Sequence, residues 1–151
     1  MPLVSGPISP THGAVVDLIV GVSKNRRKRL QSAGLPIPAP INVRTIIDTG
    51  SALTGFRSVV FAQLQVSHFA IIPVRTTSTQ PGQPHQAKQF DVSLALFPGG
   101  APSAFFSVRA IASDDFDPQA EDGVEGILGR DILDRFNLFY RGLDRQFDLA
   151  W

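Results

Sequence analysis

Short apolar segments bounded by glycine and proline recur along this 151-residue chain, and their length is the feature that most restricts its fold. Residues 13–22 read GAVVDLIVGV, and residues 41–47 read INVRTII. Brief runs rich in β-branched residues between turn-forming residues are typical of strands. Because such segments outnumber the helical ones, the sequence predicts a single, mainly β domain over residues 1–151.

The remaining segments extend this prediction along the chain. We expect a flexible or interface arm at residues 1–12, a short helix near residues 23–32 capped by Ser23, and one or two helical turns at 58–64. A two-turn helix is expected at 130–136. Further strands are predicted at 70–78, 89–97 and 105–111, with a turn at 80–84, a turn at 98–102, an acidic loop at 114–122 and a terminal hairpin over 138–151.

Composition excludes several kinds of chemistry. The chain has no cysteine, which rules out disulfides, thiol nucleophiles and thiolate metal sites. Its three histidines are scattered, so we expect neither a metal site nor a cofactor. The N-terminal residues lack the pattern of a signal peptide, and no segment approaches the roughly 20 apolar residues that span a bilayer. The sequence therefore predicts a cytoplasmic protein without a membrane segment.

The net charge of +1 conceals a local excess of positive charge. Five of the fourteen basic residues lie within positions 24–29, which leaves nine basic against thirteen acidic residues elsewhere. The cluster is short and its segment contains no aromatic residue, so we interpret it as a solvated helix face and expect no nucleic acid partner. A basic, nucleic-acid-associated domain is the alternative, and it predicts salt-sensitive binding.

Asp48-Thr49-Gly50-Ser51 directly follows the apolar segment 41–47. An Asp-Thr-Gly tripeptide alone is most often an ordinary turn. A second motif, Ile127-Leu128-Gly129-Arg130-Asp131, occurs about 80 residues later at an expected strand-to-helix junction. The combination is far more specific than either motif alone.

Together these motifs resemble those of the retropepsin-like aspartic proteases, the single-domain relatives of pepsin found in retroviruses and bacteria. The resemblance covers roughly residues 15–151. It implies a closed β-barrel or sandwich with one short late helix and a flap hairpin. It also implies that Asp48 is catalytic, that the hydroxyl of Thr49 locks two active-site loops together, that Gly50 presents its carbonyl group to substrate, and that Ser51 lies near the outer oxygen of Asp48.

Other residues receive roles from the same resemblance. The flap would contain Thr79, Gln80, Pro81, Gly82 and Gln83, although an ordinary surface turn is the alternative. Gly129, Arg130 and Asp131 would be structural supports. Ala52 occupies the position of the acidic partner that the arginine has in viral relatives, so Arg130 must be held differently. Two readings stay open for Phe147, Leu149 and Trp151: core residues, or one side of an intersubunit sheet.

Metal-free peptide hydrolysis needs one carboxylate that takes a proton from water and another group that protonates the carbonyl oxygen. This chain has one Asp-Thr-Gly and about half the length of a bilobal enzyme. The sequence therefore predicts a homodimeric aspartic endopeptidase acting on a peptide or protein substrate, with two copies of Asp48 in one site. An inactive peptide-binding or dimerisation module is the alternative. A serine nucleophile at Ser51 is less favoured, because no Gly-x-Ser-x-Gly motif surrounds it.

Overall fold

The computed structural model describes residues 2–76, 79–96, 104–116, 119 and 123–151. The described part of the chain contains strands and short helices in the following order: β1 Leu3–Ser9, β2 Gly13–Val22, α1 Lys24–Ser32, β3 Ile41–Ile47, β4 Gly55–Phe56, α2 Ser58–Gln63, β5 Ala70–Val74, β6 His85–Leu96, β7 Ala104–Ala112, β8 Gly126–Leu128, α3 Arg130–Leu133, β9 Asn137–Arg141 and β10 Gln146–Ala150.

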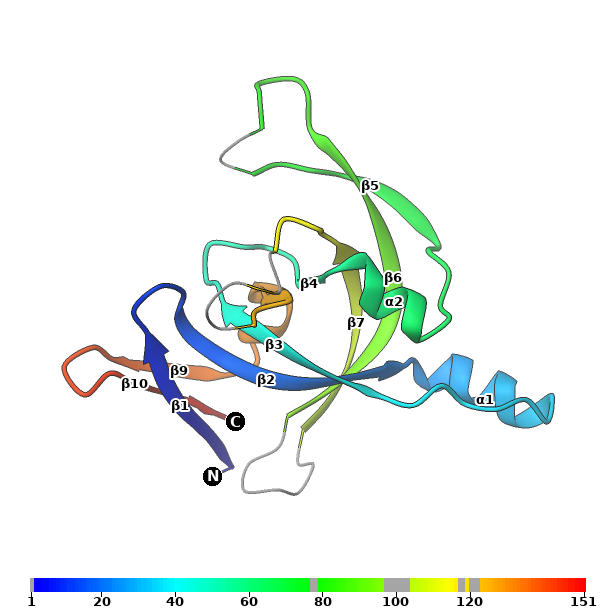
Figure 1. Ribbon diagram of the computed structural model, residues 1–151, viewed down its shortest axis with the longest axis horizontal. Coiled ribbons are helices and arrows are strands. Elements are labelled where there is room, and N and C mark those ends of the chain that lie inside the picture. The colour runs from blue at the N-terminus through cyan, green and yellow to red at the C-terminus, as the bar shows by residue number, and fades with distance from the viewer. Residues whose placement is uncertain (1, 77–78, 97–103, 117–118, 120–122) are drawn as a thin grey trace.

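Strands β2, β3, β8, β4, β7 and β6 form a closed barrel (Figure 1). The closure depends on β2, which pairs with β3 on one edge through Val15–Val20 and with β6 on the other through Ile19–Val22. A barrel has no free edge, so every one of these strands has a partner on both sides. The prediction of a mainly β fold with a closed barrel is confirmed.

Alternating side chains of these strands fill the barrel. On β2, Val16, Leu18 and Val20 are buried while Asp17 is exposed, the period of two expected for a strand with one buried face. Helix α2 closes part of the barrel with Phe61, whose ring stacks on Phe90 of β6 at a centroid distance of 4.0 Å. The same core extends to Phe147 and Leu149 of β10, which are fully buried.

A second sheet forms from the two ends of the chain. Strand β10 pairs with β1 on one side and with β9 on the other, and β1 also pairs with β2. Phe147 and Leu149 are therefore core residues of the chain itself, and their sheet is built within one subunit. Much of the expected arm at residues 1–12 is the paired strand β1; a role for it at an interface stays a prediction.

Helix α1 starts as expected, because the side chain of Ser23 accepts a hydrogen bond from the backbone N–H of Arg26. Helix α3 is shorter than expected and ends at Leu133 rather than at residue 136. Its C-cap is Asp134, and Asn137 already pairs with Ala150 in the terminal hairpin, so the chain must leave the helix to enter β9. The predicted turn at 98–102 lies outside the described residues, as does part of the loop at 114–122.

Candidate functional site

The end of β3 positions Asp48. Strand β3 runs parallel to β8, and β8 pairs on its other edge with β4. The loop of residues 48–54 connects β3 to β4 and must cross the end of β8 to do so. The backbone N–H of Asp48 donates to the carbonyl of Leu128, the last residue of β8, at 3.1 Å. Asp48 thus stands where a buried strand leaves the barrel.

Gly129 makes this crossing possible. A Cβ atom at residue 129 would lie 2.4 Å from the carbonyl oxygen of Leu53, closer than real atoms approach. The backbone of Gly129 is extended, with φ of −93°, so the reason for glycine is space and not a special backbone conformation. Just after it, the N–H of Arg130 donates to Ser51 O at 2.9 Å and that of Asp131 to Ala52 O at 3.3 Å. The loop of residues 48–54 therefore packs directly on the start of α3.

Thr54 and Asp131 connect the two segments through side chains. Thr54 is fully buried; its hydroxyl donates to Asp131 Oδ1 at 2.6 Å and accepts from the N–H of Gly129 at 3.0 Å. The N–H of Thr54 donates to the other carboxylate oxygen of Asp131 at 3.0 Å. The sequence did not indicate a role for Thr54, since a lone threonine between Leu53 and Gly55 belongs to no recognisable motif. Asp131, expected as a support, contacts this loop directly.

The carboxylate of Asp48 is half-buried and keeps one oxygen bound within its own turn. Oδ1 accepts a hydrogen bond from the N–H of Gly50 at 2.8 Å, and a Cβ atom on Gly50 would lie only 3.1 Å from that oxygen. The N–H of Ser51 donates to the backbone carbonyl of Asp48 at 3.2 Å, which closes the turn. Thr49 and Gly50 are exposed at its tip.

Ser51 and Arg130 support the loop through different groups. The hydroxyl of Ser51 donates to the carbonyl of Leu53 at 2.7 Å, so in the single chain it holds the loop and not the outer oxygen of Asp48. Arg130 contributes its backbone N–H to the loop, whereas its side chain is exposed. A hydroxyl can serve a backbone carbonyl within its own turn at little entropic cost, which accounts for the position of Ser51.

The expected flap segment lies in the connection between β5 and β6, which form an antiparallel hairpin closed by the pair Val74 and His85. The N–H of Gln83 donates to Gln80 O at 3.1 Å, and Gly82 has a φ of +78°, so a tight turn forms at its tip. Gln80, Pro81, Gly82 and Gln83 are exposed. In Figure 1 this hairpin extends beyond the barrel.

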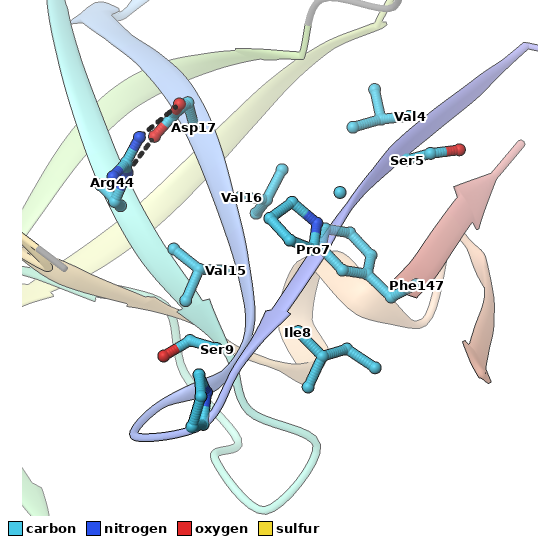
Figure 2. Close-up of a pocket in the computed structure, with 12 residues that line it drawn as sticks. Val4, Ser5, Pro7, Ile8, Ser9, Val15, Val16, Asp17, Arg44 and Phe147 are labelled. Carbon is cyan, nitrogen blue, oxygen red and sulfur yellow. Dashed lines mark hydrogen bonds and ion pairs between the residues drawn. The ribbon is translucent and has the colours of Figure 1, made fainter. Parts of the chain in front are cut away.

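A pocket of about 500 Å³ lies between β1 and β2, and Asp48 is not among its lining residues. Figure 2 shows Pro7 and Phe147 on one wall and the ion pair of Asp17 with Arg44, at 2.9 Å, on the other. Its charged groups are therefore already paired.

These strands and their order define a retropepsin-like barrel. The fold is similar to the crystal structure of a retropepsin-like aspartic protease from Rickettsia conorii, with a TM-score of 0.59 over 97% of this chain and 89% of that one. The two sequences are 14% identical, so this similarity establishes the fold. No protein-family model matches the chain, and no curated protein matches it.

Two further observations concern the site and its surroundings. Among the described residues, no group of three or more histidine, cysteine, aspartate or glutamate side chains could hold a metal ion. Within the same part of the chain, no helix has the length and apolar character needed to cross a membrane.

Proposed function

We propose that this chain is one subunit of a homodimeric aspartic endopeptidase, in which the two copies of Asp48 activate water for peptide-bond hydrolysis. The observation that carries the proposal is the position of Asp48, held by the N–H of Gly50 on a loop that β3, β8 and α3 support in a retropepsin-like barrel. A strand end with a rigid loop is where a catalytic carboxylate can be held in one orientation.

The chemistry requires two carboxylates in different protonation states. One must accept a proton from water while the other donates a proton to the carbonyl oxygen of the substrate. Two aspartates held close together cannot both ionise, and they therefore share one proton. This behaviour is established for aspartic proteases generally. The chain supplies a single Asp-Thr-Gly, so a twofold axis through the loop tips would supply the second carboxylate.

The exposed tip of the loop fits such an axis. Thr49 and Gly50 are exposed in the single chain, whereas Ser51 is half-buried and Thr54 is buried. The hydroxyl of Thr49 would meet the partner loop, and the carbonyl of Gly50 would be free to accept a hydrogen bond from substrate. Gly129, Arg130 and Asp131 would keep the loop in position through the bonds described above.

The hairpin of β5 and β6 would act as the flap, with residues 79–83 at its tip. Flaps of this kind close over a substrate and exclude water. Pro81 and Pro84 flank the tip glycine and restrict its backbone, so we expect this flap to move as a stiff unit. A substrate peptide would lie extended between the two flaps and the two Asp48 side chains.

Substitution of the carboxylate by its amide tests the proposal. Asp48→Asn keeps the shape of the side chain but removes its acid–base capacity, so we expect kcat/KM to fall by about 100-fold or more. Cleavage would be followed by mass spectrometry on a mixture of unstructured peptides. Asp144→Asn, an exposed carboxylate on the terminal hairpin, is the matched control and should cleave like the wild type.

Two results would contradict the proposal. Equal cleavage by the wild type and Asp48→Asn would assign the activity to another group. Peptide binding without any cleavage by the wild-type dimer would instead favour the alternative of an inactive peptide-binding module.

A further inference from the structure

Helix α1 carries an unusual concentration of positive charge. Its sequence KNRRKRLQS contains five basic residues and no acidic residue, and none of its nine residues is buried. The helix projects from the barrel beyond the ends of β2 and β3 (Figure 1). A helix that buries no residue contributes little to the core, so core packing does not determine its composition.

The structure places an aromatic residue beside this helix that is far from it in the sequence. A pocket of about 380 Å³ separates the start of α1 from β7, and its lining includes Lys24, Arg27, Phe105, Ser93 and Ser107. Lys24 and Arg27 are three positions apart and therefore share one face of the helix. Phe105 is 70% exposed, although it lies on β7 in a backbone pair with Ala95 of β6.

The exposure of Phe105 is not needed by the fold. Its neighbour Phe106, which also lines the pocket, packs its ring against Phe136 at 5.3 Å and receives the guanidinium of Arg135 at 5.3 Å. Phe105 has no aromatic or cation partner of this kind among the described residues. A ring held on a paired strand beside two cations is a preformed surface on which a flat group can stack.

We propose that the pocket bounded by Lys24, Arg27 and Phe105 binds single-stranded nucleic acid. An unpaired base stacks on the ring of Phe105, and the adjacent phosphates contact Lys24 and Arg27. Single-strand binding sites combine a basic groove with an aromatic platform, and both parts are present here. The basic residues on the other faces of α1 add a sequence-independent attraction to the same polyanion.

Other anionic partners fit the residues less well. Duplex nucleic acid offers no unpaired base to Phe105. A bilayer surface would be met by a helix with one apolar and one basic face, whereas α1 has a single apolar residue, Leu30, and cations around its circumference.

Asp91 lies near the start of α1, in an adjoining pocket, but its cross-strand neighbour is Arg109. The acidic group therefore has a cation beside it and does not line the pocket of Phe105.

The proposed site is separate from Asp48. Helix α1 follows β2 and precedes β3 at the end where Val20 faces Ile41, and Asp48 follows the opposite end of β3. Seven strand residues at about 3.3 Å each place roughly 20 Å between the two ends. Binding at α1 consequently does not depend on whether Asp48 hydrolyses peptides.

Fluorescence anisotropy with a labelled oligothymidine of about 20 nucleotides, longer than a single-strand site of roughly 4–16 nucleotides, tests the proposal. Wild-type protein should bind, with an affinity that falls as salt rises. In the double variant Lys24→Ala/Arg27→Ala, the slope of log affinity against log salt should decrease by about 1.4, since each lost phosphate contact accounts for about 0.7. Phe105→Ala should weaken binding by about tenfold at constant salt slope.

Matched variants separate local contacts from general effects. Lys88→Ala removes an exposed cation on β6, and Phe139→Ala removes an exposed ring on β9; both should bind like the wild type. Phe105→Tyr retains the ring and should restore binding. Thermal unfolding by circular dichroism verifies that each variant is folded.

Three outcomes would overturn the proposal. One is equal binding by Phe105→Ala and the wild type, which would leave only diffuse charge attraction. Another is tighter binding to a duplex of the same sequence. The third is absence of oligothymidine binding together with binding to phosphatidylserine vesicles or to an acidic peptide, which would assign the cluster to a different class of partner.

Discussion

Thr54 is the residue that most closely couples the loop of Asp48 to the rest of the barrel. Its single hydroxyl donates to Asp131 and accepts from Gly129, and both bonds are buried or nearly so. Buried polar groups of this kind are costly when one partner is removed, because the other is left without a hydrogen bond. The network therefore favours one conformation of the loop.

Replacing Thr54 with valine tests the strength of this network. Valine has nearly the same shape but leaves the N–H of Gly129 without its acceptor and the Asp131 carboxylate without one donor. We expect a loss of about 2–4 kcal/mol in the free energy of unfolding, measured by urea denaturation. Thr54→Ser retains the hydroxyl and should lose clearly less. Equal losses for the two variants would mean that the methyl group, and not the hydroxyl, stabilises this position.

Gly129 provides a second test at the residue scale. In Gly129→Ala the new methyl group meets the backbone of Leu53, which cannot move without displacing the loop of Asp48. We expect a destabilisation of about 1–3 kcal/mol and a marked fall in any peptidase activity. Gly142→Ala is the control, since its Cβ atom would be 3.9 Å from the nearest atom, in Tyr140. A Gly129→Ala variant as stable and active as Gly142→Ala would contradict this view of the loop.

Among the elements, α2 is held by a carboxylate from a distant part of the chain. The N–H and the hydroxyl of Ser58, the first helical residue, donate to Asp114 at 2.8 and 2.6 Å. The hydroxyl and then the N–H of Ser58 lower the pKa of Asp114 below its usual value, with a smaller contribution from Arg57. The ionised form of Asp114 is therefore the one that stabilises the start of α2.

This arrangement predicts a dependence of stability on pH. A carboxyl group whose pKa is lower in the folded state stabilises the fold above its unfolded pKa of about 3.9, and that contribution disappears as the pH falls through the lower folded pKa. Asp114→Ala should cost about 1 kcal/mol or less at neutral pH, because the group is exposed. The difference in melting temperature between wild type and variant should shrink below about pH 4. A difference that stays constant from pH 7 to about pH 3 would show that charge is not involved.

The strands were more predictable than the short helices. Strand β2 was anticipated with the observed bounds because it is apolar, half of its ten residues are β-branched, and it runs from a glycine to a capping serine. Helix α3 was expected to be longer, since its apolar spacing continues to Phe136, but pairing of the terminal hairpin ends it at Leu133. Strand β1 was not anticipated: its pairing with β10 joins residues about 140 positions apart, which local pattern cannot reveal.

At the candidate site, too, residues within sequence motifs could be predicted, whereas contacts between residues far apart in the chain could not. Asp48 and Gly129 could be selected from their motifs. The role of Thr54 could not, because its partner Asp131 lies 77 positions away. Likewise, the basic cluster of α1 was interpreted as a solvated face without aromatic neighbours, and only folding brings Phe105 beside Lys24 and Arg27.

At the scale of the whole molecule, the described part of the chain forms a closed barrel, and the loop of Asp48 exposes its tip, Thr49 and Gly50. The ends of the chain complete a sheet within the same subunit, with β9 at its outer edge. Consequently two copies of the proposed dimer would not need to exchange terminal strands to fold, and the proposed contact at the loop tips would form between already folded barrels. We expect the isolated chain to be folded and the catalytic site to require association.

The most direct test of a shared site is a mixing experiment between wild-type protein and Asp48→Asn. If each active site needs two wild-type chains, an equal mixture with free subunit exchange contains about one quarter active dimers, so the activity per total chain should fall to about one quarter. A site completed within one chain would instead give about one half, the value for simple dilution. We expect activity to rise with the square of the wild-type fraction, whereas a linear rise would show that one chain completes the site by itself.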